Sequence, residues 1–402
     1  MSKLIFMDKY KDKVLLVNGA GRGHLNLVKT AKSMGIQVIT TGMAGPCLSI
    51  ADKNYPEVHP GHPDEVLEVA RREHVDGVLI CCNDKGIRSV GHCNDVLHLV
   101  GISEQAAKYS SDKLAMKKRL VECGVRTAKY EKIHNVEALQ DALTRLKMPV
   151  IIKATDLQGS RGICIVRDAS ELESSFNEVM SLTNKEYCIV EEFIQGTEFG
   201  AQAFVYNNEV LFVLPHGDET YMARTAVPVG HYMPYDMTEK LSADVDLQAR
   251  NAIRALCLNN CAVNIDFIEK DGKAYIIELT GRGGANGLTD ITGLYFGINY
   301  YRMMIQMALG GNPREVYDER LSVPNAARSE MIKSENTGIV KSLHIPQIPD
   351  VEINMFVHEG DEIRAFTNSN DAIGEVFVVA KTMRECEEKL DFTYRNIDIT
   401  YV

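Results

Sequence analysis

The sequence lacks the features that would place a protein in a membrane, on nucleic acid or outside the cell. No apolar run approaches the roughly 20 residues of a membrane-spanning helix, and the first residues, MSKLIFMDKYKDK, contain no long apolar core. The formal net charge of −11 leaves no basic excess, which argues against nucleic acid and anionic membrane as partners. We therefore expect a cytoplasmic protein.

Cysteines at metal-binding spacing are also missing. The ten cysteines include no CxxC pair, and several stand inside apolar runs such as VLICC and GICIV. This pattern predicts reduced, partly buried thiols. A zinc site formed by Cys81, Cys82, His92 and Cys93 is the weaker alternative, because no two of these residues have the usual ligand spacing.

The chain is long enough for several domains. A length of 402 residues predicts two or three cores with a cleft between them, and 45% hydrophobic residues without a low-complexity tract predict compact folding. Over residues 13 to 100, the apolar runs KVLLVN, GIQVITT, YPEVHP and DGVLICC alternate with helical patterns. This alternation is typical of a doubly wound parallel sheet, so we expect an α/β domain over residues 1–102.

The rest of the chain has a different pattern. A helix is expected through KLAMKKRLVEC, capped by Ser110, Ser111 and Asp112 and ended by Gly124. Alternating apolar segments with Asn207-Asn208 and Asp271-Gly272 turns then predict antiparallel sheet. We expect a second domain over residues 103–330 and a small α+β domain over residues 331–402.

The glycine cluster VNGAGRGHLN follows the first apolar run. Its GxGxG pattern differs from the GxGxxG dinucleotide fingerprint, and the second strand ends in Thr40-Thr41-Gly42 without the acidic residue that would hold a ribose. A tight strand-to-helix turn and a site for another small anion at the helix N-terminus remain as alternatives to NAD.

The segment PVIIKATDLQGSRGICIV places Lys153 at the end of an apolar strand, before a glycine-rich loop and a returning strand. Such a loop can fold backbone N–H groups over a polyphosphate while the lysine neutralises its charge. It is not a Walker loop, since no GK[ST] follows. The loop is equally consistent with a surface hairpin, and the acidic segment EEFIQGTEF is equally consistent with an exposed turn.

Two carboxylates, Asp266 and Glu278, interrupt apolar strands in CAVNIDFIEKDGKAYIIELTGR. Buried carboxylates need a partner, and two on one face require a cation. Because side chains alternate along a strand, a two-residue Asp271-Gly272 turn would separate them, whereas a three-residue loop from Lys270 to Gly272 would bring them together. We therefore predict the three-residue loop. Arg282, four residues after Glu278, could stabilise charge on a transferring phosphoryl group.

This ordered set of motifs resembles the ATP-grasp superfamily of carboxylate-amine ligases, whose members include biotin carboxylase, D-alanine ligase, glycinamide ribonucleotide synthetase and amino-acid ligases. The similarity spans roughly residues 10 to 330 and includes SSDKLAMKKRL, VIIKA, QGSRG, VEEFIQGTEF, Asp266 and IIELTGR. It implies a Rossmann-like pre-ATP-grasp domain, a two-lobed ATP-grasp domain with a lid over about 126–190, and a small C-terminal domain.

The resemblance also implies roles for individual residues. Catalytic roles are implied for Arg282 and Lys153, and Arg224 is added by position alone. The expected ATP-binding residues are Lys113, Lys153, Gly159, Ser160, Gly162, Glu191, Glu192, Phe193, Ile194 and Glu198. The expected ligands of one or two Mg²⁺ ions, for which Mn²⁺ could substitute, are Asp266, Glu278 and Thr280. The expected substrate contacts are Gly21, Arg22, Gly23, Asn83 and Asp84. At position 280 relatives usually carry Asn, and a threonine hydroxyl is a weaker ligand.

The implied activity is ATP-dependent ligation of a small carboxylate, such as an amino acid, to an amine through an acyl phosphate, by a protein expected to be a homodimer. A nucleotide-precursor ligase resembling phosphoribosylamine-glycine ligase is the alternative. A catalytically inactive ATP-binding sensor and an NAD-dependent oxidoreductase are alternatives of other classes.

Overall fold

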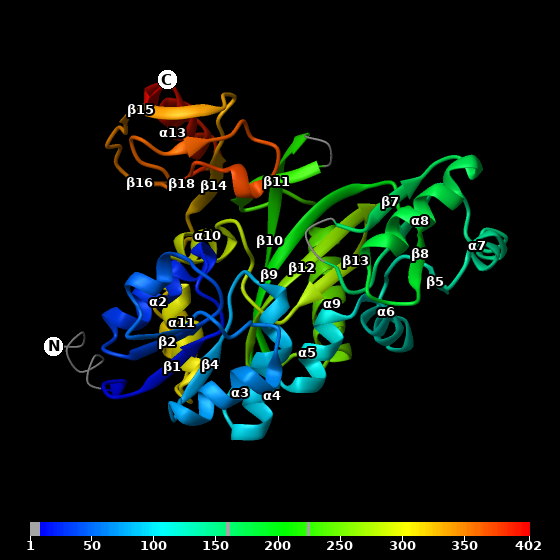
Figure 1. Ribbon diagram of the computed structural model, residues 1–402, viewed down its shortest axis with the longest axis horizontal. Helices are drawn as coiled ribbons and strands as arrows, with labels where there is room; N and C mark the ends of the chain where they lie inside the picture. Colours follow the sequence, from blue (N-terminus) through cyan, green and yellow to red (C-terminus); the bar gives the residue numbers. More distant parts are fainter. Residues whose placement is uncertain (1–8, 158–160, 223–225) are drawn as a thin grey trace.

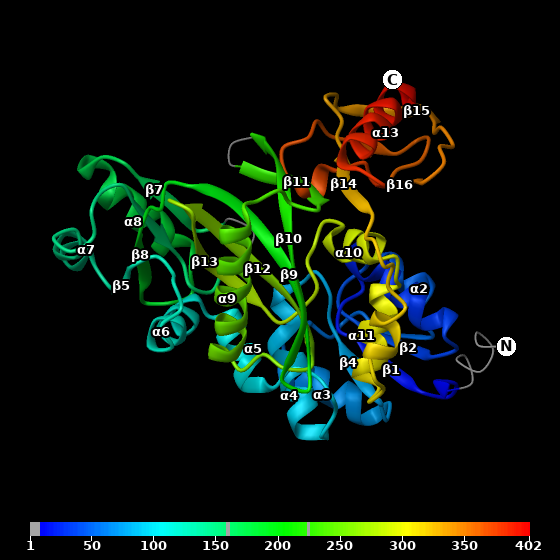
Figure 2. The same ribbon diagram turned by 180° about the vertical axis from the view of Figure 1, so that it is seen from behind.

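The computed structural model describes residues 9–157, 161–222 and 226–402. Figure 1 shows three groups of elements: the first hundred residues in blue, the central residues in green, and the C-terminal residues in orange and red above them. Figure 2 shows the same groups from behind. Among the described residues, no helix has both the length and the apolar character needed to cross a bilayer.

The N-terminal group is built on a four-stranded parallel sheet. Its strands, in spatial order, are β3 (Lys53–Tyr55), β2 (Gln37–Thr41), β1 (Val14–Val17) and β4 (Gly77–Leu79). The helices that alternate with them are α2 (Leu25–Ser33), α3 (Pro63–Arg72) and α4 (Ile87–Leu97). The parallel order is the one predicted from the alternating apolar runs. The third strand was misplaced, because it lies at Lys53–Tyr55 and YPEVHP is mostly turn.

Two helices connect this sheet to the rest of the chain. They are α5 (Glu104–Ser111) and α6 (Lys113–Glu122). The Asp112 carboxylate caps α6 by accepting a 3.0 Å hydrogen bond from the N–H of Ala115, and Gly124 follows the helix with a φ of 69°. The start and end of α6 therefore confirm the prediction made from the capping residues.

A smaller antiparallel sheet follows. Its spatial order is β5 (Tyr130–Ile133), β8 (Cys188–Glu192), β6 (Val150–Lys153) and β7 (Ile163–Val166). The helices α7 (Val136–Ala142) and α8 (Leu172–Leu182) pack with it around one apolar core. This sheet carries Lys153 and Glu191 on adjacent strands.

The largest sheet is antiparallel and has eight strands. In spatial order they are β13 (Lys273–Thr280), β12 (Cys261–Lys270), β9 (Thr197–Tyr206), β10 (Glu209–Met222), β11 (Ala226–Met233), β14 (Ala326–Ile332), β18 (Gly374–Ala380) and β16 (Val351–Met355). The expected domain boundary at 330 and 331 lies inside β14, so the sheet continues across it.

The remaining helices and strands complete the packing. The helix α9 (Glu239–Ala255) packs against β13, while α11 (Tyr300–Ala308) packs against α2 and β4. Tyr300 and Met303 of α11 share a core with Leu15 and Val17 of β1, so residues distant in sequence complete the N-terminal group. The other elements are α10 (Leu288–Phe296), α12 (Arg314–Tyr317), α13 (Met383–Asn396), and a sheet of β17 (Glu362–Ile363), β15 (Gly338–His344) and β19 (Asp398–Tyr401).

Candidate nucleotide and metal site

Asp266 and Glu278 lie directly opposite each other on β12 and β13, so both side chains point to one face of the sheet. The hairpin turn differs from the prediction. Lys270 pairs with Lys273 across a two-residue Asp271-Gly272 turn, in which φ is 52° and 70°, so the expected three-residue loop is wrong. A β-bulge next to Asp266 reverses the alternation instead, because Ile277 is an extra residue between the partners of Asp266 and Phe267.

The electrostatics of this pair favour a cation. Burial and, to a smaller extent, the neighbouring Glu278 carboxylate raise the pKa of Asp266 to about 8. The pKa of Glu278 is lowered, chiefly by the ammonium group of Lys113, whose Nζ lies 3.1 Å from Glu278 Oε2. Two adjacent carboxylates, of which Asp266 is costly to ionise without a compensating charge, form a set of oxygen ligands that fits a hard divalent cation. The predicted ligands Asp266 and Glu278 are therefore brought together.

Polar side chains surround the carboxylate pair. Thr280 lies opposite Asn264, and its hydroxyl donates a 3.1 Å hydrogen bond to Asp84 Oδ1. Asn264 donates a 3.1 Å hydrogen bond to Asp266 Oδ1 and accepts one of 2.6 Å from Gln202 Nε2. The sequence reading missed Asn264, although its position two residues before Asp266 predicts the same face of β12. The amide N–H of Asn264 therefore faces Asp266, while its amide oxygen faces Gln202.

Arg282 connects the carboxylate pair with the N-terminal sheet. Its Nε and Nη2 atoms donate to the two oxygens of Asp84, the latter at 2.7 Å, in a two-pronged ion pair. Burial acts to raise the pKa of Asp84, but the charge of Arg282 outweighs it and holds this pKa below its ordinary value. The Arg282 side chain is 9% exposed. The predicted catalytic arginine thus contacts a residue that was predicted to bind substrate.

A buried group of lysines lies next to the site. Lys153 and Lys117 contact the same Glu191 oxygen, at 3.0 and 3.2 Å. Lys117 also donates a 2.7 Å hydrogen bond to Thr127. Lys117 was missed by the sequence reading, although it lies four residues after Lys113 and so on the same face of α6. Lys113 donates a 3.1 Å hydrogen bond to the Leu157 carbonyl, at the start of the glycine loop.

The comparisons with known proteins agree with this geometry. Residues 111–224 match the family model "Phosphoribosylglycinamide synthetase, ATP-grasp (A) domain". A crystal structure of phosphoribosylglycinamide synthetase from Anaerococcus prevotii is 45% identical and superposes with a TM-score of 0.87, covering 98% of this chain and 100% of that chain. The chain belongs to the ATP-grasp superfamily.

Other relatives of this ATP-grasp chain are more distant. An L-amino acid ligase from Bacillus licheniformis has the same fold, with 20% identity, a TM-score of 0.80 and coverage of 98% of this chain and 99% of that chain. The phosphoribosylamine–glycine ligase of Fusobacterium nucleatum is 27% identical over 208 residues, which are 50% of this chain and 48% of that protein. The chain spans 32% to 64% of the length of the first curated relatives that it matches.

The remaining nucleotide residues expected of an ATP-grasp protein lie around the end of β8. Phe193 donates its N–H to Pro149 O at 3.1 Å, Glu192 accepts from the N–H of Lys129, and Ile194 is buried. Glu198 lies on β9 and is exposed. Gly162 has a φ of 64°, which favours glycine. Three further predicted residues, Gly159, Ser160 and Arg224, lie outside the described residues.

The opening glycine loop of this ATP-grasp chain lines a cavity of about 390 Å³. Gly21, Gly23 and Asn83 are among its lining residues, and so is Lys85, which the sequence reading missed despite its place directly after Asn83-Asp84. Arg22 does not line this cavity. Its guanidinium lies 3.5 Å from the centre of the Phe356 ring, which follows β16. The structure thus brings most of the predicted substrate residues together and directs Arg22 elsewhere.

Proposed function

We propose that this ATP-grasp chain is an ATP-dependent ligase that joins a carboxylate to an amine through an acyl phosphate and releases ADP and phosphate. The single observation that carries the proposal is the pairing of Asp266 with Glu278 on one sheet face, next to Lys113 and the Arg282–Asp84 ion pair. Phosphoryl transfer needs this combination of oxygen ligands and cationic groups.

In this proposal each residue has a defined task. Asp266 and Glu278 hold one or two Mg²⁺ ions, with the Thr280 hydroxyl as a further oxygen ligand. Asn264 orients Asp266 by donating a hydrogen bond to it. The bound metal neutralises charge on the phosphates. Lys113 and Lys153 bind phosphate oxygens, which requires that they exchange their present carboxylate partners for the nucleotide. Arg282 orients the reacting carboxylate and phosphoryl group, because Asp84 fixes its guanidinium plane.

The nucleotide and the second substrate take separate places in the proposal. The proposed ATP contacts are the loop through Gly162, residues 191–194 at the end of β8, and Glu198. The proposal also keeps the predicted roles of Gly159, Ser160 and Arg224. The cavity beside Gly21, Gly23 and Asn83 takes a substrate, for which Lys85 offers a positive charge at the rim. The glycine loop and the sheet around it are proposed to close as a lid that shields the acyl phosphate from water.

The substrate pair is proposed at the level of class, a small carboxylate and an amine. The first candidate for the carboxylate is an amino acid. The second candidate, a phosphoribosylamine–glycine ligase activity, is favoured by the 45% identity to the Anaerococcus prevotii synthetase over nearly the whole chain. We also propose the three-part organisation over residues 1–102, 103–330 and 331–402, a homodimer, and a cytoplasmic location.

The test is ADP release from ATP and Mg²⁺ across a panel of carboxylates and amines that includes glycine with phosphoribosylamine. We expect release only when one matching acid and amine pair is present, and its loss in Glu278→Gln. ADP release that does not depend on either substrate would contradict the ligase. So would the absence of ADP release with every pair while ATP still binds, a result that would favour an ATP-binding sensor. Binding of a nicotinamide dinucleotide in place of ATP would favour the oxidoreductase alternative.

A further inference from the structure

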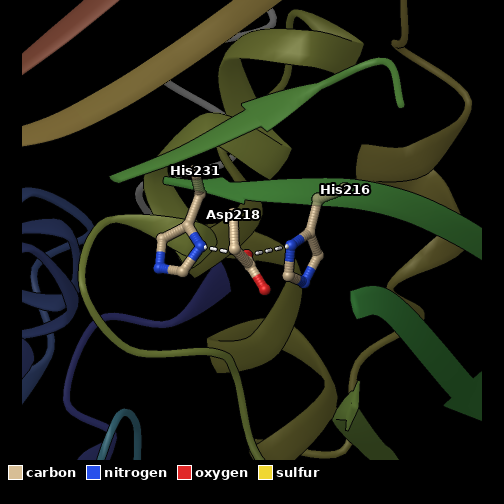
Figure 3. Close-up of side chains that lie close together, drawn as sticks. All are labelled: His216, Asp218 and His231. Atoms are coloured by element: carbon tan, nitrogen blue, oxygen red, sulfur yellow. Dashed lines mark hydrogen bonds and ion pairs between the residues drawn. The ribbon is translucent and has the colours of Figure 1, made fainter. Parts of the chain in front are cut away.

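Two histidines and one aspartate form a compact group that the proposed ligase does not use (Figure 3). His216 and Asp218 belong to β10 and His231 to β11. The Nδ1 atoms of His216 and His231 lie 3.0 and 2.6 Å from the same oxygen, Asp218 Oδ1. One potential ligand atom from each of the three residues lies within 4.8 Å of the other two. Figure 3 shows both rings turned toward the carboxylate between them.

The strand register fixes this arrangement. Asp218 is the direct partner of His231, and His216 precedes Asp218 by two residues, so all three side chains share one sheet face. Gly200 pairs with both His216 and Asp266. A Cβ at Gly200 would lie 2.2 Å from His216 Cε1, so only glycine leaves room for this ring. The group therefore lies on the same face as Asp266 and Glu278, two strands away.

Both histidine side chains are enclosed by protein, with 2% and 6% of their surface exposed. Within the described ranges, the ion-pair partners of Asp218 are these two histidines.

We propose that His216, Asp218 and His231 form a second metal site, for a divalent transition ion of the zinc class. Two imidazole nitrogens and one carboxylate oxygen are a ligand set typical of Zn²⁺, whose bonds to them are about 2.0–2.2 Å long. Three ligands leave a further coordination position for water or substrate. If Nδ1 of each ring binds the metal, the proton of the neutral imidazole must be on Nε2. In the described part of the chain no group donates a hydrogen bond to either Nε2 atom, so both can carry this proton.

The test uses the full chain, stripped with chelator and returned to excess Mg²⁺ so that the Asp266 and Glu278 site is filled. Zn²⁺ is then added, unbound metal is removed by gel filtration, and metal content is measured. We expect stoichiometric retention of Zn²⁺ by the wild type and its loss in His216→Gln and in His231→Gln. Glu278→Gln should keep it. The matched control is His62→Gln, because His62 also contacts a carboxylate, that of Glu65, but is exposed.

A second measurement does not depend on the variants folding. Co²⁺ bound to nitrogen and oxygen ligands in a tetrahedral site gives intense visible absorption, so the wild type with Co²⁺ should show these bands, and Zn²⁺ should abolish them. Absence of the bands, failure to retain Zn²⁺, or retention by the folded histidine variants would overturn the proposal and leave the three residues as a hydrogen-bonded group. The outcome does not depend on whether the chain is a ligase, because no ATP or substrate is present.

Discussion

At the scale of single residues, the site depends on buried ion pairs whose partners come from distant parts of the chain. Asp84 and Arg282 are 198 positions apart and share two hydrogen bonds. Lys117 and Lys153 share one buried carboxylate of Glu191. Removing one partner of such a pair leaves the other charge without compensation in the interior. Substitutions here should therefore affect both stability and activity.

The first prediction concerns the Arg282–Asp84 pair. Asp84→Ala and Arg282→Ala should each lower the free energy of unfolding by about 3–5 kcal/mol, because each strands a buried charge. The double variant should lose much less than the two single losses added together. Urea unfolding of the four proteins gives the coupling energy. Additive losses would mean that the two side chains do not interact in solution.

The second prediction concerns pH and Glu375. Burial and, to a smaller extent, the nearby Asp290 carboxylate raise the pKa of Glu375 to about 7. In the unfolded chain the pKa is about 4.3, so the folded state holds the proton more tightly. The stabilisation from Glu375 should be complete below about pH 4.3 and lost as pH rises through about 7. Melting temperatures should fall over this range in the wild type.

The control for this pH dependence is Glu375→Gln. A neutral amide of the same shape should flatten the part of the profile between pH about 4.3 and 7 and leave the protein more stable at the upper end. An unchanged slope in the variant would assign the pH dependence to other groups, among them Asp290, whose pKa burial raises to about 6.

At the scale of elements, one extra residue in a strand decides whether the metal carboxylates meet. The β12–β13 hairpin closes with a two-residue turn, which alone would put Asp266 and Glu278 on opposite faces. The bulge at Ile277 reverses this. A feature that costs regular ladder pairing is thus the reason that the two carboxylates share a face.

Deletion of Ile277 therefore tests the element directly. In the regular ladder that results, Ile276 stays opposite Phe267 and Glu278 stays opposite Asp266, so both carboxylates should remain on one face and Mg²⁺-dependent ADP release should be retained. A loss of at least about a hundredfold in a folded variant would mean that the bulge itself is needed to position Glu278. Circular dichroism checks that the fold remains. The matched control is Gly272→Ala in the turn of the same hairpin, where a φ of 70° makes alanine cost about 1–2 kcal/mol. This variant should be less stable but keep its activity.

At the scale of the whole molecule, the first and last parts of the chain are in contact. Arg22 follows β1 and stacks on Phe356 in the C-terminal part. Burial lowers the pKa of Arg22, while the charge of Glu375 opposes this effect. The glycine loop is thereby attached to residues beyond position 350. Arg22 can contribute to substrate binding directly, or by holding the C-terminal part in place.

We expect Arg22→Ala to raise KM for the acid or amine substrate and to leave KM for ATP nearly unchanged. Phe356→Leu keeps Arg22 but removes the ring on which it stacks. If Arg22 binds substrate itself, Phe356→Leu should have the smaller effect on KM. Equal effects would assign the contribution to the contact between the two parts. A selective loss of ATP affinity in Arg22→Ala would instead indicate that the loop containing Gly21, Arg22 and Gly23 binds the nucleotide.

The sequence alone determined the elements and the residue types of the site. The periods of apolar residues predicted parallel sheet before residue 100 and antiparallel sheet after it, and local capping groups predicted α6, because these signals act over a few neighbouring positions. The order of lysines, glycines and carboxylates along the chain was sufficient to identify the superfamily, because the catalytic chemistry constrains the residue type at each of these positions.

Only the tertiary structure decided which of these residues meet. The bulge at Ile277, the approach of Asn264 to Asp266, the pairing of Asp84 with Arg282 and the stacking of Arg22 on Phe356 all depend on register or on contacts between distant segments. No local pattern encodes them, because side-chain alternation changes face with every inserted residue and packing partners are fixed by the whole fold. The His216, Asp218 and His231 group is of the same kind, because it depends on the pairing of two strands.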